Sequence, residues 1–292
     1  MKKTSIAKSI ATPIDSATAL PRRDFLVAMA GAGFALAAQP IMAQTVINTN
    51  VAGLTAGWVS IPVANGSMPA YRAQPARGRH FPVVLVVSEI FGVHEWITDI
   101  CRRLAKLGYL AIAPDLFMRQ GDPRTLADMQ QIMTDIIAKT PDADVMADLD
   151  ATVAWAAGTG ADAQRLGITG FCWGGRVTWL YAAHNHNIKA GVAWYGRVQA
   201  EVNAFTPRHP VHVAAEIKAP VLGLYGGLDH YITQDHLVEM RAALAKAGSR
   251  SEIHVYPKAD HGFLADYRPT YNAEAARDGW QRLQDWLHKN GV

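Results

Sequence analysis

Hydrophobic and polar positions alternate along the chain in two distinct patterns. Short, nearly continuous apolar runs, such as FPVVLVVSE at 81–89, are typical of parallel strands that are covered on both faces. Between these runs, apolar residues recur every three or four positions, as at 96–108, where the stripe ends at Gly108, and this spacing predicts amphipathic helices. We expect strands at 81–89, 109–115, 165–171, 188–196, 219–227 and 251–257, and helices at 96–108, 123–138, 142–157, 174–185, 233–247 and 271–289.

The order of these elements predicts an α/β fold. Strands and helices alternate through most of the chain, which is typical of a mainly parallel sheet with helices on both faces. On the N-terminal side, the alternating stretches 57–63 and 69–75 are split by Asn65-Gly66, a dipeptide that favours a tight turn, so we expect a hairpin there. No linker is visible after the first 43 residues, and residues 44–292 are therefore predicted to form a single domain.

The first 43 residues have the features of a secretory signal. Arg22 and Arg23 stand before a short apolar run at 25–38, and Ala43 offers a cleavage point. The run is too short and too glycine-rich to span a bilayer comfortably. Twin arginines in such a leader are typical of the bacterial twin-arginine route, which exports folded proteins, so we expect a periplasmic protein with no stable membrane insertion after cleavage. An uncleaved N-terminal anchor is the alternative.

Removal of the leader changes the charge balance of the chain. The whole sequence has a formal charge of +3, but residues 1–43 hold five of the 28 Lys and Arg and two of the 25 Asp and Glu, which leaves 23 of each. No basic run follows residue 43, and we therefore expect no nucleic-acid partner. With 50% hydrophobic and 18% charged residues, a mostly disordered protein is also excluded.

The candidate chemistry begins at Cys172, one of two cysteines in the chain. Residues 170–174 read GFCWG and lie between a predicted strand and a predicted helix. The sequence fits a nucleophile with one glycine two residues before it and another two residues after it. The glycines let the backbone turn sharply, and the amides at the start of the next helix favour a thiolate or an oxyanion at the same point. The alternatives are a buried cysteine in an ordinary turn and a disulfide with Cys101.

A nucleophile of this kind needs a base and a group that orients the base. Asp229 follows one predicted strand and His261 follows the next, so both are expected at the carboxyl edge of the sheet, beside Cys172. Their order along the chain, nucleophile, acid and then histidine, is that of α/β-hydrolases. Asp229 has the alternative interpretation of a turn or helix-capping residue, and His230 and Asp260 are neighbours that could be confused with the pair.

The remaining histidines are scattered. His184 with His186, and His209 with His212, have the spacing of metal pairs, but no cysteine or carboxylate completes either set. We therefore interpret them as surface residues, and we expect neither a metal nor a cofactor.

Two backbone amides are expected to form an oxyanion hole. One belongs to Trp173, directly after the nucleophile, and the other to Ile90, just after the strand at 81–89. Glu89 lies beside them. A carboxylate at the end of an apolar strand and near a thiol is expected to have a raised pKa, and it could hydrogen-bond the thiol or accept its proton. The alternative is a glutamate that reaches solvent.

Five motifs, SEIFGV, APDLF, GFCWGG, GGLD and HGF, occur in an order that resembles the dienelactone hydrolase family of α/β-hydrolases. The likeness covers roughly residues 57 to 290, and the cysteine turn together with the upstream EIFG is specific. The resemblance implies that Cys172, Asp229 and His261 form a catalytic triad, and that the amides of Ile90 and Trp173 form the oxyanion hole.

The resemblance also implies a role for Glu89 and a class of substrate. Glu89 would hold the resting cysteine as a neutral thiol and take its proton when substrate arrives. The founding activity of the family is hydrolysis of dienelactone, a cyclic enol ester that carries a carboxylate, to maleylacetate. Arginines hold this carboxylate in the family, one of them a few residues after the histidine, where this chain has Ala265. Arg268 and Arg197 are candidates for that role, with ordinary surface or structural arginines as the alternative.

We therefore expect a hydrolase that cleaves a small ester or lactone through a thioester on Cys172. Its partners would be a small-molecule substrate and the twin-arginine export machinery. A broad-specificity carboxylesterase and a non-catalytic binding protein that keeps the fold are the alternatives. The predicted export departs from the family pattern, because the chlorocatechol breakdown in which the founding enzymes act is cytoplasmic.

Overall fold

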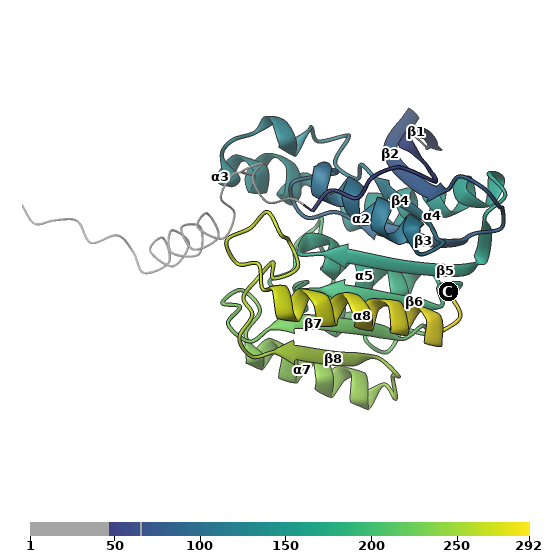
Figure 1. The fold of residues 1–292 in the computed structure, drawn as a ribbon. Helices are drawn as coiled ribbons and strands as arrows, with labels where there is room; N and C mark the ends of the chain where they lie inside the picture. The colour runs from purple at the N-terminus through teal and green to yellow at the C-terminus, as the bar shows by residue number, and fades with distance from the viewer. Residues whose placement is uncertain (1–46, 65) are drawn as a thin grey trace, which may run out of the picture.

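An eight-stranded sheet organises the part of the chain that the structure describes. The structure is a computed structural model and describes residues 47–64 and 66–292. The predicted signal segment at 1–43 lies outside these residues, so export stays a prediction. Across the sheet, the strands follow the order β1-β2-β4-β3-β5-β6-β7-β8 (Figure 1).

The sheet is mainly parallel, as the sequence predicts. β1 pairs with β2 and β2 with β4 in antiparallel register, and every later pair is parallel. β1 and β2 form the expected hairpin, with Val63 paired to Gly66, and Asn65 of the predicted turn lies outside the described residues. The strands are β1 (Leu54–Val63), β2 (Gly66–Pro75), β3 (Pro82–Val87), β4 (Leu110–Pro114), β5 (Asp162–Phe171), β6 (Ala190–Trp194), β7 (Val221–Gly226) and β8 (Glu252–Tyr256).

Helices cover both faces of this sheet. A side chain at Gly167 of β5 would meet Leu287 of α8, whereas one at Gly170, on the opposite face of the strand, would meet α5. Figure 1 accordingly shows α8 in front of the sheet. The helices are α2 (Glu95–Lys106), α3 (Met129–Gln131), α4 (Asp142–Gly158), α5 (Trp173–His184), α6 (Pro210–Val213), α7 (Gln234–Lys246) and α8 (Ala273–Lys289). Among the described residues, no helix has both the length and the apolar character needed to cross a membrane.

The helix predicted at 123–138 is wrong. This segment instead contains a 3-10 turn η1 (Pro123–Thr125), the single turn α3, a π-helical turn η2 (Ile132–Ile136) and a 3-10 turn η3 (Ile137–Lys139). The carboxylates of Asp122 and Asp128 each accept a hydrogen bond from the amide two residues later. Each of these caps starts its own short turn. A continuous helix over 123–138 would have only one such cap, at its first turn.

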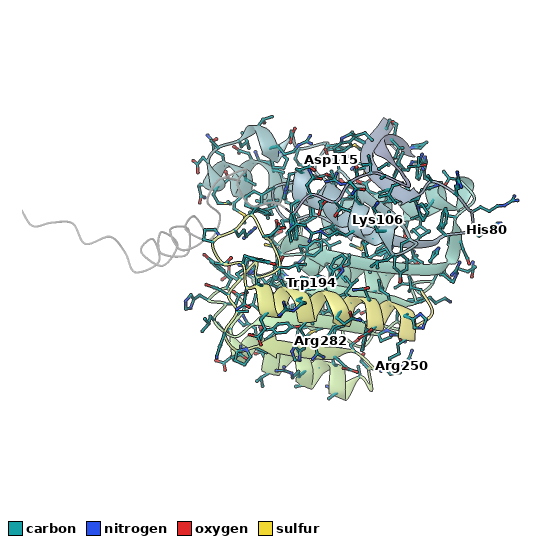
Figure 2. All side chains as sticks on the ribbon, viewed as in Figure 1. His80, Lys106, Asp115, Trp194, Arg250 and Arg282 are labelled. Atoms are coloured by element: carbon teal, nitrogen blue, oxygen red, sulfur yellow. The ribbon has the colours of Figure 1, made fainter. Side chains whose placement is uncertain are left out.

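The strands in the middle of the sheet form the core. From Val83 to Val87, β3 is fully buried, and each such aliphatic side chain stabilises the fold by about 1.5–3 kcal/mol. Trp194 of β6, labelled in Figure 2, is buried where α8 crosses the sheet. A Cβ at Gly279 of α8 would lie 2.6 Å from the Trp194 ring, so the close approach of this helix requires a glycine. The carboxyl ends of β3, β5, β7 and β8 meet at one edge, where the candidate site lies.

Two glycine substitutions test the close contact between α5 and β3. A Cβ at Gly174 would lie 2.3 Å from the carbonyl oxygen of Val87, so we expect Gly174→Ala to lower the free energy of unfolding by about 3 kcal/mol. Gly158, at the end of α4, has no atom within 4 Å of an added Cβ, and Gly158→Ala should be neutral or stabilise by up to about 1 kcal/mol. Denaturant unfolding of both variants measures the difference. Equal effects would contradict the contact.

Candidate active site

Cys172 occupies the sharp turn that the sequence predicts between β5 and α5. Its backbone has φ 55° and ψ −112°, a left-handed conformation that is rare for a residue with a side chain. A Cβ at Gly170 would lie 2.1 Å from the carbonyl oxygen of Gly174, so the turn closes only because both positions are glycine. The Cys172 amide donates to Trp194 of β6 at 3.0 Å, which anchors the turn to the sheet.

His261 and Asp229 lie together as predicted. Nδ1 of His261 is 2.8 Å from Oδ2 of Asp229, and both side chains are buried. The other Asp229 oxygen accepts hydrogen bonds from the amides of Tyr231 at 2.8 Å and Ile232 at 3.1 Å. Asp229 therefore also caps its own turn, and the two interpretations of this residue are compatible. The neighbour Asp260 bonds the backbone amide of His261.

The imidazole of His261 joins Asp229 to Cys172. Burial alone would lower its pKa, but the charges of Cys172 and Asp229, together with hydrogen bonds to both side chains, raise the pKa of His261 to about 10. The largest contribution that raises this pKa is a negative charge on Cys172, so an imidazolium at His261 and a thiolate beside it would stabilise each other. The rings of Tyr195 and Tyr231 pack edge-on against the imidazole, with centroids 5.2 Å and 5.6 Å away.

The two amides expected to form an oxyanion hole are available. Ile90 and Trp173 line the same cavity as Cys172 and His261. Neither amide donates a hydrogen bond to another of the described residues. Trp173 is the first residue of α5, so its N–H also lies at the positive end of that helix.

Glu89 is in a different electrostatic state from the predicted one. Its side chain is fully buried and accepts hydrogen bonds from Arg268, at 2.8 Å, and from the Tyr267 hydroxyl, while Nε2 of His94 lies 3.5 Å away. Burial alone would raise the pKa of Glu89, but the Arg268 charge and the contacts with His94 and Tyr267 lower it to about 2. The expectation of a raised pKa is therefore wrong, and so is the alternative of a solvent-exposed carboxylate.

The two candidate arginines have different positions. Arg268 is buried and paired with Glu89, so it is a structural arginine of the interior and does not line the Cys172 cavity. Arg197 is exposed and lines this cavity, and no hydrogen bond or ion pair joins its side chain to another described residue. Of the two, Arg197 is placed to contact a ligand.

The cavity over Cys172 has a volume of about 220 Å³. The sequence did not indicate its tyrosines, Tyr195 and Tyr231, although Tyr195 follows β6 at the carboxyl edge and that position was an available signal. Tyr195 also has a positive φ of 38°. Its strained backbone holds the ring against His261.

His209 is not the surface residue that the sequence predicts. It is buried, accepts a hydrogen bond at Nδ1 from Nε of Arg176 at 3.0 Å, and contacts the Glu201 carbonyl at 3.1 Å. Arg176 in turn forms two bonds of 2.7 Å with Asp142. Burial lowers the pKa of His209, which keeps it neutral and able to accept this bond. The cluster fixes one wall of the cavity, and its members are too far apart in the sequence to have been recognised as a group.

Neither a metal site nor a disulfide occurs among the described residues. No group of three or more His, Cys, Asp and Glu side chains in this part of the chain could hold a metal ion. Cys101 and Cys172 are both free, which excludes the disulfide alternative. Cys101 lies in the core, where burial raises the pKa of its thiol far above the ordinary value.

The sheet topology, the strained turn at Cys172 and the adjacent histidine–aspartate pair define an α/β-hydrolase. The model of the dienelactone hydrolase family matches residues 68–291. A "Putative carboxymethylenebutenolidase" of Methylorubrum extorquens is 59% identical over 276 residues, which cover 94% of this chain and 95% of that protein. A protein of the same description from Escherichia coli K12 is 52% identical, covering 89% of this chain and 96% of the relative.

A solved structure agrees with these relatives. A crystal structure from Klebsiella pneumoniae, described as a "Putative Dienelactone Hydrolase", has a TM-score of 0.80 and 54% identity, and the match covers 81% of this chain and 99% of that one. The chain therefore belongs to the dienelactone hydrolase family, and it is a carboxylic ester hydrolase similar to carboxymethylenebutenolidases.

Proposed function

We propose that the protein hydrolyses a small ester or lactone through a covalent thioester on Cys172. The observation that carries this proposal is the shared cavity of Cys172 and His261, with Asp229 bonded to the far side of the imidazole at 2.8 Å. A nucleophile, a base and an orienting carboxylate in this arrangement are the elements of covalent acyl transfer.

The first half of the reaction transfers the acyl group to sulfur. The Cys172 thiolate attacks the ester carbonyl carbon, and the electrons of the carbon–oxygen double bond move to the oxygen. The amides of Ile90 and Trp173 stabilise this oxyanion, each by about 3 kcal/mol. When the intermediate collapses, the bond to the leaving oxygen breaks, and the proton on His261 passes to that oxygen.

The second half releases the acid. Neutral His261 takes a proton from water, and the hydroxide attacks the thioester carbonyl at the same oxyanion site. The carbon–sulfur bond breaks, which frees the carboxylic acid and restores the thiolate beside the protonated imidazole. Asp229 keeps the ring oriented through both halves and stabilises its positive charge.

Glu89 acts in this proposal through Arg268 and not as the base. A carboxylate with a pKa near 2 is a weak acceptor for a thiol proton, so the role that the family resemblance implies for Glu89 is assigned to His261. The charge of Arg268 interacts with that of Cys172, and the salt bridge with Glu89 holds the guanidinium in place. Glu89 is thus a positioning residue for a buried positive charge near the sulfur.

The cavity favours a small substrate that carries a negative charge. A volume of about 220 Å³ holds only a few carbon atoms beyond the reacting ester. Arg197, at the cavity wall, has no described partner and can bind a carboxylate through two parallel N–H bonds. We propose that Arg197 selects ester or lactone acids over neutral esters.

Trapping the acyl intermediate tests the nucleophile. We expect an activated aryl ester to acylate Cys172 and leave Cys101 unmodified, because Cys101 is fully buried and its pKa is raised. Cys172→Ala should lower kcat/KM by more than about 1,000-fold, since no other group in the cavity replaces the sulfur. Mass spectrometry of the quenched reaction locates the adduct, and steady-state kinetics measure the loss.

Cys172→Ser provides the conservative control. It should fold and turn over slowly, because the site is charged to stabilise a thiolate. Full activity of Cys172→Ala, or an adduct on Cys101, would contradict the proposed reaction.

Arg197→Gln tests the substrate class. For an ester that bears a carboxylate, kcat/KM should fall about tenfold or more, mainly through KM, because a charge-assisted hydrogen bond is lost. The uncharged methyl ester of the same compound should change little. Arg250→Gln is the matched control, since Arg250 precedes β8 at the opposite edge of the sheet (Figure 2). Equal losses for both esters would contradict the selection of an acid.

A further inference from the structure

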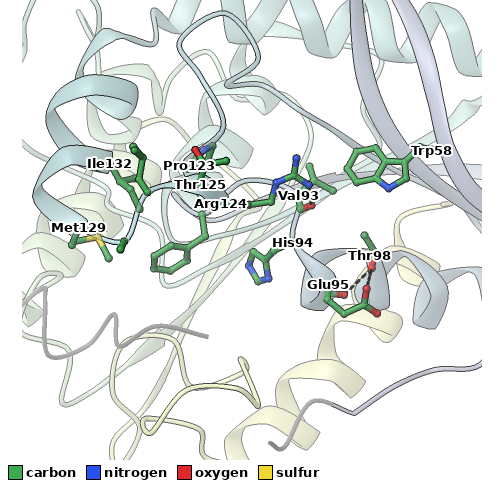
Figure 3. A pocket seen from close by; sticks show the side chains of 13 residues that line it. Trp58, Val93, His94, Glu95, Thr98, Pro123, Arg124, Thr125, Met129 and Ile132 are labelled. Carbon is green, nitrogen blue, oxygen red and sulfur yellow. Dashed lines mark hydrogen bonds between the residues drawn. The ribbon is translucent and has the colours of Figure 1, made fainter. Parts of the chain in front are cut away.

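A second and larger cavity lies beside the loop that follows β3. It has a volume of about 580 Å³ and shares no lining residue with the Cys172 cavity. Figure 3 shows the side chains that line it. Adjacent residues of the same segments face different cavities, since Ile90 lines the first and Phe91 the second, and Met133 lines the first and Ile132 the second. The proposed reaction uses no residue of this second cavity.

The walls of the second cavity are mainly apolar. Phe91 follows β3, Leu126 and Met129 belong to the segment after η1, and Trp58 comes from β1. The Trp58 side chain is 49% exposed, and the Arg124 guanidinium lies over its ring at 5.7 Å from the centroid. Aromatic and aliphatic walls of this kind fit a planar apolar group.

Arg124 provides free hydrogen-bond donors at this cavity. Its side chain donates to both carboxylate oxygens of Asp122, at 2.7 Å and 2.8 Å, and to the Val93 carbonyl at 3.2 Å. These three bonds use three of the five N–H groups of a guanidinium. Two donors therefore remain, in a side chain whose position is already fixed.

His94 adds a second polar group to the cavity lining. Its side chain is buried, and Nδ1 has no hydrogen-bond partner among the described residues, while Nε2 faces Glu89 at 3.5 Å. The carboxylate acceptors here already have donors. Glu95 lines the cavity and accepts hydrogen bonds from Arg102 at one oxygen and from Thr98 at the other, and Asp122, which does not line the cavity, accepts from Arg124 at both oxygens.

We infer that the second cavity binds a small aromatic carboxylic acid, with its ring against the apolar walls and its carboxylate on Arg124. The two unused N–H donors of Arg124 favour a ligand with acceptor oxygens, because the carboxylates nearby already have donors. The apolar walls favour a ligand with a planar ring. This inference does not depend on the proposed reaction at Cys172, because none of its residues takes part there.

Calorimetric titration of the full-length protein with benzoate tests this site. Benzoate should bind with a dissociation constant of about 1 mM or lower, and benzylamine, which carries the opposite charge, should bind at least tenfold more weakly. Arg124→Gln should weaken benzoate binding at least tenfold. Arg282→Gln is the matched control and should leave it unchanged, because Arg282 is likewise an exposed arginine paired with an aspartate, Asp278.

Two further measurements separate this site from the Cys172 cavity. Benzoate should still bind after Cys172 has been alkylated with iodoacetamide, since that reagent fills the other cavity. Ala127→Trp, an exposed position in the lining of the second cavity, should fill it and abolish binding. The inference would be overturned if benzoate did not bind, or if its binding were lost on alkylation. It would also be overturned if benzoate still bound to Ala127→Trp, or if benzoate and benzylamine bound equally well.

Discussion

The contact between the start of α5 and the ends of β3 and β5 is the constraint on which the site depends. It forces Cys172 into a left-handed backbone conformation, because the chain must reverse within one residue between strand and helix. Only glycine fits at 170 and 174, where an added Cβ would overlap backbone oxygens. Cys172 and Trp173 both line one cavity, so this strained turn supplies the preorganised geometry that the proposed reaction needs.

Two buried charge systems surround this turn. In one, the charges of Cys172 and Asp229 raise the pKa of His261 and so favour the positively charged imidazolium. In the other, Arg268 holds Glu89 as a carboxylate in a site where burial alone would favour the neutral acid. His261 and Glu89 therefore interact with different charged partners. In the proposed reaction His261 moves protons, whereas Glu89 fixes the position of a positive charge.

Much of the fold, and the grouping of the three candidate catalytic residues, could be predicted because both depend on local signals. Apolar runs located the strands, and in a parallel sheet the ends of successive strands meet at one edge, which brought Cys172, Asp229 and His261 together. The glycines around Cys172 were informative for the same reason, since they report a local backbone requirement. The segment 123–138 failed because the capping role of Asp122 and Asp128 competed with an apolar spacing that fits a helix.

The state of Glu89 could not be predicted because it depends on partners distant in the sequence. Arg268 is 179 residues away, and Tyr267 is 178 residues away. Burial was a reasonable expectation at the end of an apolar strand, but the compensating charge was not visible there. The prediction that His209 lies at the surface was wrong for a similar reason. Its ring nitrogen accepts a hydrogen bond from Arg176, which is 33 residues away in the sequence.

An NMR titration of the His261 imidazole tests the central claim most directly. If Cys172, His261 and Asp229 form one charged unit, the imidazole keeps its second proton up to about pH 10. In Asp229→Asn it should lose that proton at a lower pH, because the charge that stabilises the imidazolium is gone, whereas Asp260→Asn should leave the titration unchanged. A wild-type imidazole that titrates near the ordinary value of about 6.5, or one that is indifferent to Asp229, would contradict the account.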